Sequence, residues 1–373
     1  MSLISIVHTN IVKPVETGQT ADLEVVSTPS IRNRSAIVME SQHRVIKAVP
    51  NEIVLQIVEH MDTITRRCFM ATNKRISALI ESHERSISKI RVDRFALPPL
   101  GNILSSATDE RYVLLNNTFS MVLELEIREN KINRLIQECP KVFYMTSPPW
   151  LPSLTPLQQT RLPPILTRAL HQCDHIADIA ANGSCPPIPS KYYHAILDGV
   201  YELPSALLSS NDELNEFNPL TNRNARSKQI EYIQSLSLED VAGIFILVNM
   251  IGYGLMCSYP ASSTSYERKT VIEECVLRHG TWFVWSRLLG GPGMRELAGF
   301  IISAGRAELR QWEAGALDGP PGLKMTLIGR LRELLSGDPE DEVADTVAKT
   351  LKRLVLGDDK ERTGWDSASE DEE

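Results

Sequence analysis

The sequence predicts an all-α protein, in which a short helical module near the N-terminus precedes an irregular multi-helix domain and both ends are disordered. Three observations support this fold class. Apolar residues recur at helical spacing along most of the chain, Pro- and Gly-rich turns separate these stretches, and no repeat of fixed period occurs. The chain has 373 residues, of which 42% are hydrophobic, so it can bury a sizeable core.

Charge and cysteine content indicate which partners and which cellular compartment to expect. A formal net charge of -8 without a basic stripe argues against a nucleic-acid partner, because phosphate binding relies on clustered Lys and Arg. The six cysteines are scattered, form no CxxC pair and follow no secretory leader. We therefore expect reduced thiols and a location in the cytoplasm, the nucleus or both.

Composition divides the chain into four parts. Residues 1–44 are rich in Ser, Thr, Val and Pro without a helical period, which predicts a disordered lead-in. A helical module follows over residues 45–90, with a turn expected at Asp62–Thr63 between two short helices. Residues 95–356 are the predicted helical body. Residues 357–373 are too polar to bury a core, so we expect a disordered acidic tail.

The body contains several predicted helices. Residues 109–139 are rich in Glu, Leu, Lys, Arg and Gln, which favours one or two helices, although VLELEI within them also alternates as a strand does. Thr155 and Pro156 suit the N-cap and first position of a helix, which Pro163–Pro164 should kink or split. Further helices are expected at residues 192–201, 225–236, 238–259, 265–289, 294–316, 324–335 and 341–356.

One apolar run, from Val241 to Tyr259, carries no charge and approaches the length needed to cross a bilayer. It contains Asn249 and three glycines, and it lacks flanking Trp or clustered Lys and Arg. These features favour a buried core helix over a membrane span. In that case its bulky residues pack against other helices, namely Ile244, Phe245, Val248 and Ile251.

The most informative segment is VPNEIVLQIVEHMD, from Val49 to Asp62. Pro50 suits the first helical turn, and Glu52 complements the positive end of a helix. Apolar residues recur every four positions on one side, with two valines beside them: Ile53, Ile57 and Met61, then Val54 and Val58. This stripe is wider than a short helix needs for its own packing, which indicates a surface for a partner.

The same segment resembles the opening of an F-box, which commonly begins Leu-Pro-x-Glu-Ile/Val-Leu. Residues 72–76, TNKRI, are similar to the Thr-Cys-Lys-Arg-Leu of fungal members. F-box proteins insert this module into the adaptor subunit of cullin-RING ubiquitin ligases and capture a substrate with the rest of the chain. The resemblance implies an F-box-like module that docks through residues 46–82, a body that binds an unknown target protein, no chemistry and no cofactor.

The adaptor contact implied by the resemblance is a helix seated in a hydrophobic groove. The residues assigned to it are Val49, Pro50, Glu52, Ile53, Ile57 and Met61. Arg66 and Arg67 depart from the family pattern, because apolar residues usually stand there at the start of the second helix. Either that helix is rotated locally or adaptor binding is weakened. The alternative function is a non-enzymatic helical scaffold protein whose N-terminal hairpin is part of its own core.

Motifs that carry chemistry are few. The sequence has no GxSxG elbow, no GxxxxGK[ST] phosphate loop and no GxGxxG after a strand, so we expect no enzymatic activity. His171 and His175 could share a helical face, but Cys173 would point elsewhere and Cys185 lies downstream, so we expect no metal site.

The acidic tail contains two candidate phosphorylation sites. Ser367 and Ser369 each precede a Glu by three residues, a pattern that acidophilic kinases accept. The alternative is a solvated tail that only keeps the protein soluble.

Overall fold

The computed structural model is mainly helical and describes residues 49–106, 112–145, 154–182, 223–257, 265–313, 322–335 and 357. The chain divides into two compact units, residues 1–53 and 54–373. Several predictions lie outside the described residues: the disordered lead-in 1–44, the helices at 192–201 and 341–356, the acidic tail beyond residue 357, and the phosphorylation sites Ser367 and Ser369.

The N-terminal module consists of short helices that polar caps separate. The turn predicted at Asp62–Thr63 is confirmed, since an Asp62 carboxylate oxygen accepts the Thr65 amide at 2.7 Å and begins the next helix. The prediction of only two helices was wrong. Asn73 interrupts the second one and caps its continuation by accepting the Arg75 amide. The helices are α2 (Asn51–His60), α3 (Thr63–Thr72), α4 (Lys74–Ser82) and α5 (Glu84–Val92).

A two-stranded antiparallel hairpin follows, β1 (Ile103–Leu104) and β2 (Val113–Leu114). The sequence predicted helix over the second strand, and that part of the prediction was wrong. Asn117 has a positive φ of 57°, a conformation that a right-handed helix does not contain, so helix α6 (Phe119–Glu138) begins only after this turn. The segment VLELEI lies inside α6, as expected.

Helix α7 (Pro156–Asp178) has the predicted N-terminus, in which Thr155 and Gln158 form a reciprocal capping box. The helix is not split at Pro163–Pro164. The two carbonyls that lose their amide donors belong to Gln159 and Thr160, which are exposed, so water can bond to them. The other described elements of the body are η1 (Lys141–Met145), η2 (Ile179–Asn182), α10 (Arg223–Ser235), α11 (Leu238–Cys257), α12 (Ser265–Leu288), α13 (Pro292–Glu313) and α14 (Leu323–Leu335).

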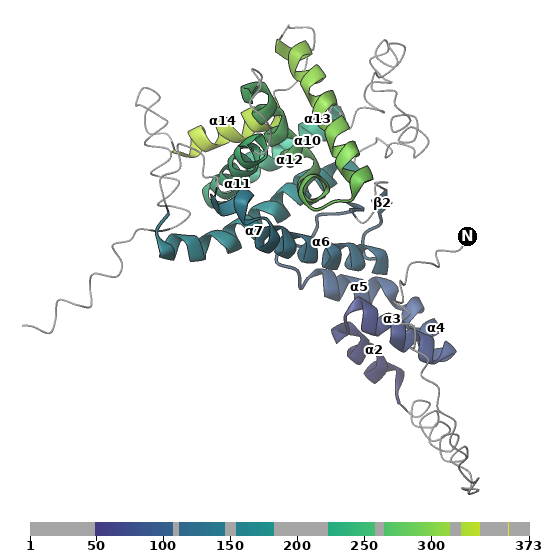
Figure 1. The fold of residues 1–373 in the computed structure, drawn as a ribbon. Coiled ribbons are helices and arrows are strands. Elements are labelled where there is room, and N and C mark those ends of the chain that lie inside the picture. Colours follow the sequence, from purple (N-terminus) through teal and green to yellow (C-terminus); the bar gives the residue numbers. More distant parts are fainter. Residues whose placement is uncertain are drawn as a thin grey trace, which may run out of the picture. The chain divides into compact units, whose positions relative to one another are not determined.

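Helix α11 (Figure 1) is part of the body core and packs against α7, α12, α14 and η1. By length and composition alone it could cross a membrane, but 72% of its most apolar window is buried within the protein. The predicted packing of its bulky residues is confirmed, because Ile244, Val248 and Ile251 are buried and Phe245 packs against the same core. These contacts favour the buried-helix interpretation.

The small and polar residues of α11 face charged partners. A Cβ atom at Gly252 would lie 2.6 Å from Cγ of Glu273, so only glycine allows this side chain of α12 to approach. Glu273 is fully buried and forms ion pairs with Lys269 and Lys324. Lys269 also donates to the Asn249 side chain at 3.3 Å. The polar positions that interrupt the apolar run are therefore used inside the body.

Candidate functional site

Helix α2 has two apolar faces with different surroundings. Val54 and Val58 are buried, whereas Ile53 and Ile57 are 45% and 46% exposed and lie one helical turn apart. Val54 and Val58 are the part of the predicted stripe that packs within the protein, as the scaffold alternative requires. The two isoleucines are candidates for contact with a partner, because burial of exposed apolar surface lowers the free energy.

Helix α3 contributes a further exposed apolar residue, Ile64, which is 74% exposed. Ile64 was not among the residues predicted from the sequence. Its signal was an isolated isoleucine in the otherwise polar first turn that follows Asp62. A single exposed apolar residue is common on protein surfaces, so Ile64 is a candidate for contact only because it lies close in sequence to the exposed isoleucines of α2.

The remaining residues assigned to the adaptor contact lie at the two ends of α2. Pro50 and Glu52 are exposed, and Val49 and Met61 are partly buried. The Met61 carbonyl accepts a hydrogen bond from the Arg91 guanidinium of α5. The adaptor role of all four residues stays a prediction.

Arg66 and Arg67 of α3 lie in opposite environments. Arg67 is exposed, whereas Arg66 is only 1% exposed and its guanidinium carbon lies 3.8 Å from the centre of the Phe119 ring of α6. Burial, together with the nearby charge of Arg91, lowers the pKa of Arg66 to about 10. Arg66 therefore points towards α6 and away from the side of α3 that exposes Ile64.

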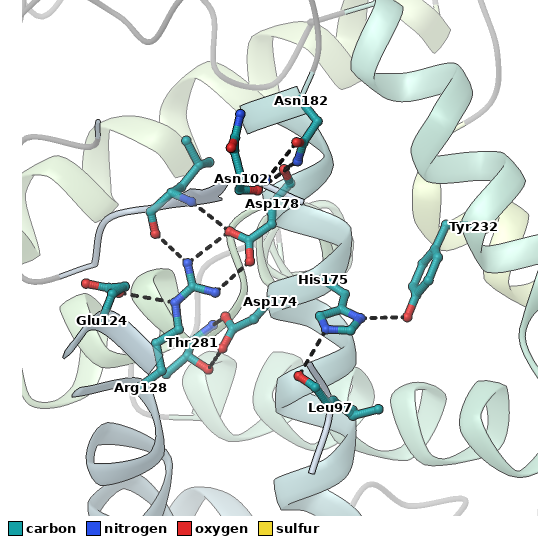
Figure 2. Close-up of polar contacts among 11 residues, drawn as sticks. Leu97, Asn102, Glu124, Arg128, Asp174, His175, Asp178, Asn182, Tyr232 and Thr281 are labelled. Atoms are coloured by element: carbon teal, nitrogen blue, oxygen red, sulfur yellow. Dashed lines mark hydrogen bonds and ion pairs between the residues drawn. The ribbon is translucent and has the colours of Figure 1, made fainter. Parts of the chain in front are cut away.

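The body contains a separate candidate, a buried polar network around α7 (Figure 2). The Arg128 guanidinium of α6 pairs with Asp178 at 2.7 Å and with Glu124 at 3.1 Å, and it donates to the Leu104 carbonyl. The Leu104 amide donates to Asp178 at 2.9 Å. Burial alone would lower the pKa of Arg128, but the surrounding carboxylates outweigh it and hold this pKa above its ordinary value.

Asp174 supplies a helix cap across two elements. Helix α12 is kinked at Gly280, where φ is 58° and ψ is -146°, a conformation that favours glycine. Asp174 of α7 accepts the Thr281 amide at 2.7 Å and the Thr281 hydroxyl at 2.8 Å, so it caps the second half of α12 (Figure 2).

His175 of α7 has two further polar partners. Its Nδ1 lies 3.0 Å from the Tyr232 hydroxyl of α10, and its Nε2 lies 3.3 Å from the Leu97 carbonyl (Figure 2). Burial lowers the pKa of His175 and of His171, and it raises the pKa of the Cys173 thiol. These directions favour neutral side chains at neutral pH.

Within the described residues, no group of three or more His, Cys, Asp or Glu side chains is placed to hold a metal ion. Cys185, the cysteine downstream of these histidines, lies outside the described residues. Because Arg128, Asp174, Asp178 and His175 all have partners within the protein, the network is best explained as a support of the fold.

The comparisons with known proteins bear on the segment that contains α2 and α3. The family model of the F-box domain matches residues 46–88. This segment contains Ile53, Ile57 and Ile64, and it also contains the buried Arg66. No curated protein and no solved structure matches the chain.

Proposed function

This chain contains an F-box domain at residues 46–88, and we propose from that premise that it is a substrate adaptor of a cullin-RING ubiquitin ligase. The domain docks on the adaptor subunit of the ligase, and the helical body, residues 95–356, captures a target protein. The chain itself performs no chemistry. Its contribution is proximity, because it holds the target near the ligase partners that transfer ubiquitin.

The observation that carries this proposal is the exposed isoleucine side chains of α2 and α3. Ile53 and Ile57 present one apolar edge of α2, and Ile64 presents another apolar side chain at the start of α3. Anchors one helical turn apart suit a hydrophobic groove on a partner. Burial of a whole isoleucine side chain is worth about 1.5–3 kcal/mol, and docking would bury the roughly half of each that is exposed, so loss of both anchors should weaken binding by about 1.5–3 kcal/mol in all.

A binding measurement with the purified ligase adaptor subunit tests the proposal. The full-length chain should bind it, and the Ile53→Asp/Ile57→Asp variant should lose at least about 100-fold in affinity, since two charges would enter an apolar groove. The matched control is Met325→Asp. Met325 lies on α14 and is 52% exposed, so this variant introduces a charge at a similarly exposed apolar position outside the F-box domain and should bind normally.

Two results would contradict the proposal. The unaltered chain could fail to bind the adaptor subunit, or the double variant could bind as tightly as the unaltered chain. Either result would favour the alternative of a non-enzymatic scaffold protein, for which the buried Val54 and Val58 of α2 supply the packing of the hairpin on its own domain.

A further inference from the structure

Besides the exposed isoleucines, this part of the chain contains a buried arginine, Arg66 of α3, and a partly buried one, Arg91 of α5. On α3, Arg66 and Ile64 are two residues apart, which places them about 200° apart around the helix. Accordingly Ile64 is exposed and Arg66 is buried. The side of α3 opposite its exposed isoleucine therefore packs against α6 through a charged residue.

The Phe119 ring compensates for burying Arg66, together with the nearby charges of Glu126 and Glu84. The Nε and Nη1 atoms of Arg66 are buried and have no hydrogen-bond partner. A buried charge without hydrogen bonds is unfavourable, whereas the face of an aromatic ring attracts a cation, most strongly where water is excluded. The Phe119 ring lies directly against the guanidinium, at 3.8 Å, and Phe119 is the first residue of α6.

Arg91 ties the end of α2 to the same helix. It donates to the Met61 carbonyl, directly after α2, and it forms an ion pair with Glu126 of α6 at 2.6 Å. Glu84 of α5 adds a third link, because its carboxylate accepts the Phe119 amide at 2.7 Å at the N-terminus of α6. The start of α6 thus contacts α3 and α5, and Arg91 of α5 in turn bonds to the segment that ends α2.

We infer that α6 belongs to the adaptor-binding unit of this chain, with Arg66 and Phe119 as positioning residues that hold α2 and α3 in the orientation required for docking. This inference rests on the proposed function. The segment that matches the F-box family ends at residue 88, before Arg91 and before α6, so it does not contain the whole unit. Neither positioning residue needs to touch the adaptor.

The first test compares the adaptor affinity of full-length variants. Phe119→Ala should raise the dissociation constant about tenfold, as expected if the docking-competent orientation falls to about a tenth of the population. Phe119→Tyr keeps the ring face and should restore binding to within about twofold. Leu115→Ala is the matched control, because Leu115 is 63% exposed, lies four residues earlier in the same turn and should leave the affinity unchanged.

The second test is a double-mutant cycle. If Arg66 and Phe119 act together, Arg66→Met combined with Phe119→Ala should weaken adaptor binding no more than Phe119→Ala alone. Residues that only support the fold independently would give additive losses. Glu126→Gln breaks the ion pair with Arg91 at a second position on α6 and should also weaken binding several-fold. If Phe119→Ala fails to fold, Arg66→Met and Glu126→Gln carry the test.

The outcomes separate this inference from the proposed function. Failure of the unaltered chain to bind the adaptor subunit overturns the proposed function. Normal binding by the unaltered chain, by Phe119→Ala and by Glu126→Gln overturns only the inference about α6. Additive losses in the double-mutant cycle, or failure of Phe119→Tyr to restore binding, overturn the role of the Arg66–Phe119 pair.

Discussion

The α2–α3 segment of the F-box domain and the network around α7 in the body differ in how their charged and apolar side chains are placed. In the body, the buried charges around α7 have partners, as the pairing of Arg128 with Asp178 and Glu124 shows. In the F-box domain, Arg66 is buried with two nitrogens unpaired, while Ile57 and Ile64 are exposed. The network around α7 is thus paired internally, whereas α2 and α3 leave isoleucines exposed, as α14 leaves Met325 exposed in the body.

Gly280→Val should have the largest effect on stability, because a side chain at this position would collide with Asp174 of α7. A Cβ atom at this position would lie 2.2 Å from Oδ1 of Asp174, and the backbone has a positive φ that β-branched residues avoid. We expect a loss of about 4 kcal/mol in the free energy of unfolding, measured in urea. Gly299→Ala is the control, since nothing lies within 4 Å of its Cβ position and unfolding should change by under about 1 kcal/mol.

Glu274 should make the body sensitive to acid. Burial would raise the pKa of Glu274, but Arg278 and Arg226 outweigh burial, and together with the amides of Leu323 and Lys324 they hold this pKa at about 2. The folded-state pKa lies below the ordinary value of 4.5, so the stabilisation is present above pH 4.5 and is lost as the pH falls towards 2.

Glu274→Gln should therefore reduce the free energy of unfolding by about 3 kcal/mol at pH 7, on the order of the pKa difference converted at 1.36 kcal/mol per unit. The difference between the variant and the unaltered chain should shrink as the pH falls from 4.5 towards 2. Urea unfolding at several pH values measures both quantities. A difference that stays constant over this range would show that the Glu274 carboxylate is not the source of the stabilisation.

Ile64→Ser should have the smallest effect on stability and tests whether this exposed isoleucine serves binding instead of folding. Ile64 is 74% exposed, and replacement of an exposed residue usually changes the free energy of unfolding by under about 0.5 kcal/mol. Binding of the ligase adaptor subunit should nevertheless weaken measurably. A marked loss of stability would mean that Ile64 supports the domain, and the contrast between the two regions would then fail at this position.

Local features were predicted best from the sequence. The cap at Thr155–Pro156 and the turn at Asp62–Thr63 depend on residues within a few positions of each other, so their chemistry is visible in a short window. The hairpin was missed because β1 and β2 have two residues each, too few for a period to register, and Asp178 of the distant α7 holds β1 through the Leu104 amide.

The all-α class, most helix positions and the resemblance of the N-terminal segment to an F-box could be predicted, because helical period, capping and family motifs are properties of neighbouring residues. Which apolar residues are exposed became clear only from the fold. It buried Val58 and exposed Ile57 on the same helix, and it covered Arg66 with Phe119 from more than 50 residues away. Burial depends on which elements meet, and this is settled by packing across the whole chain.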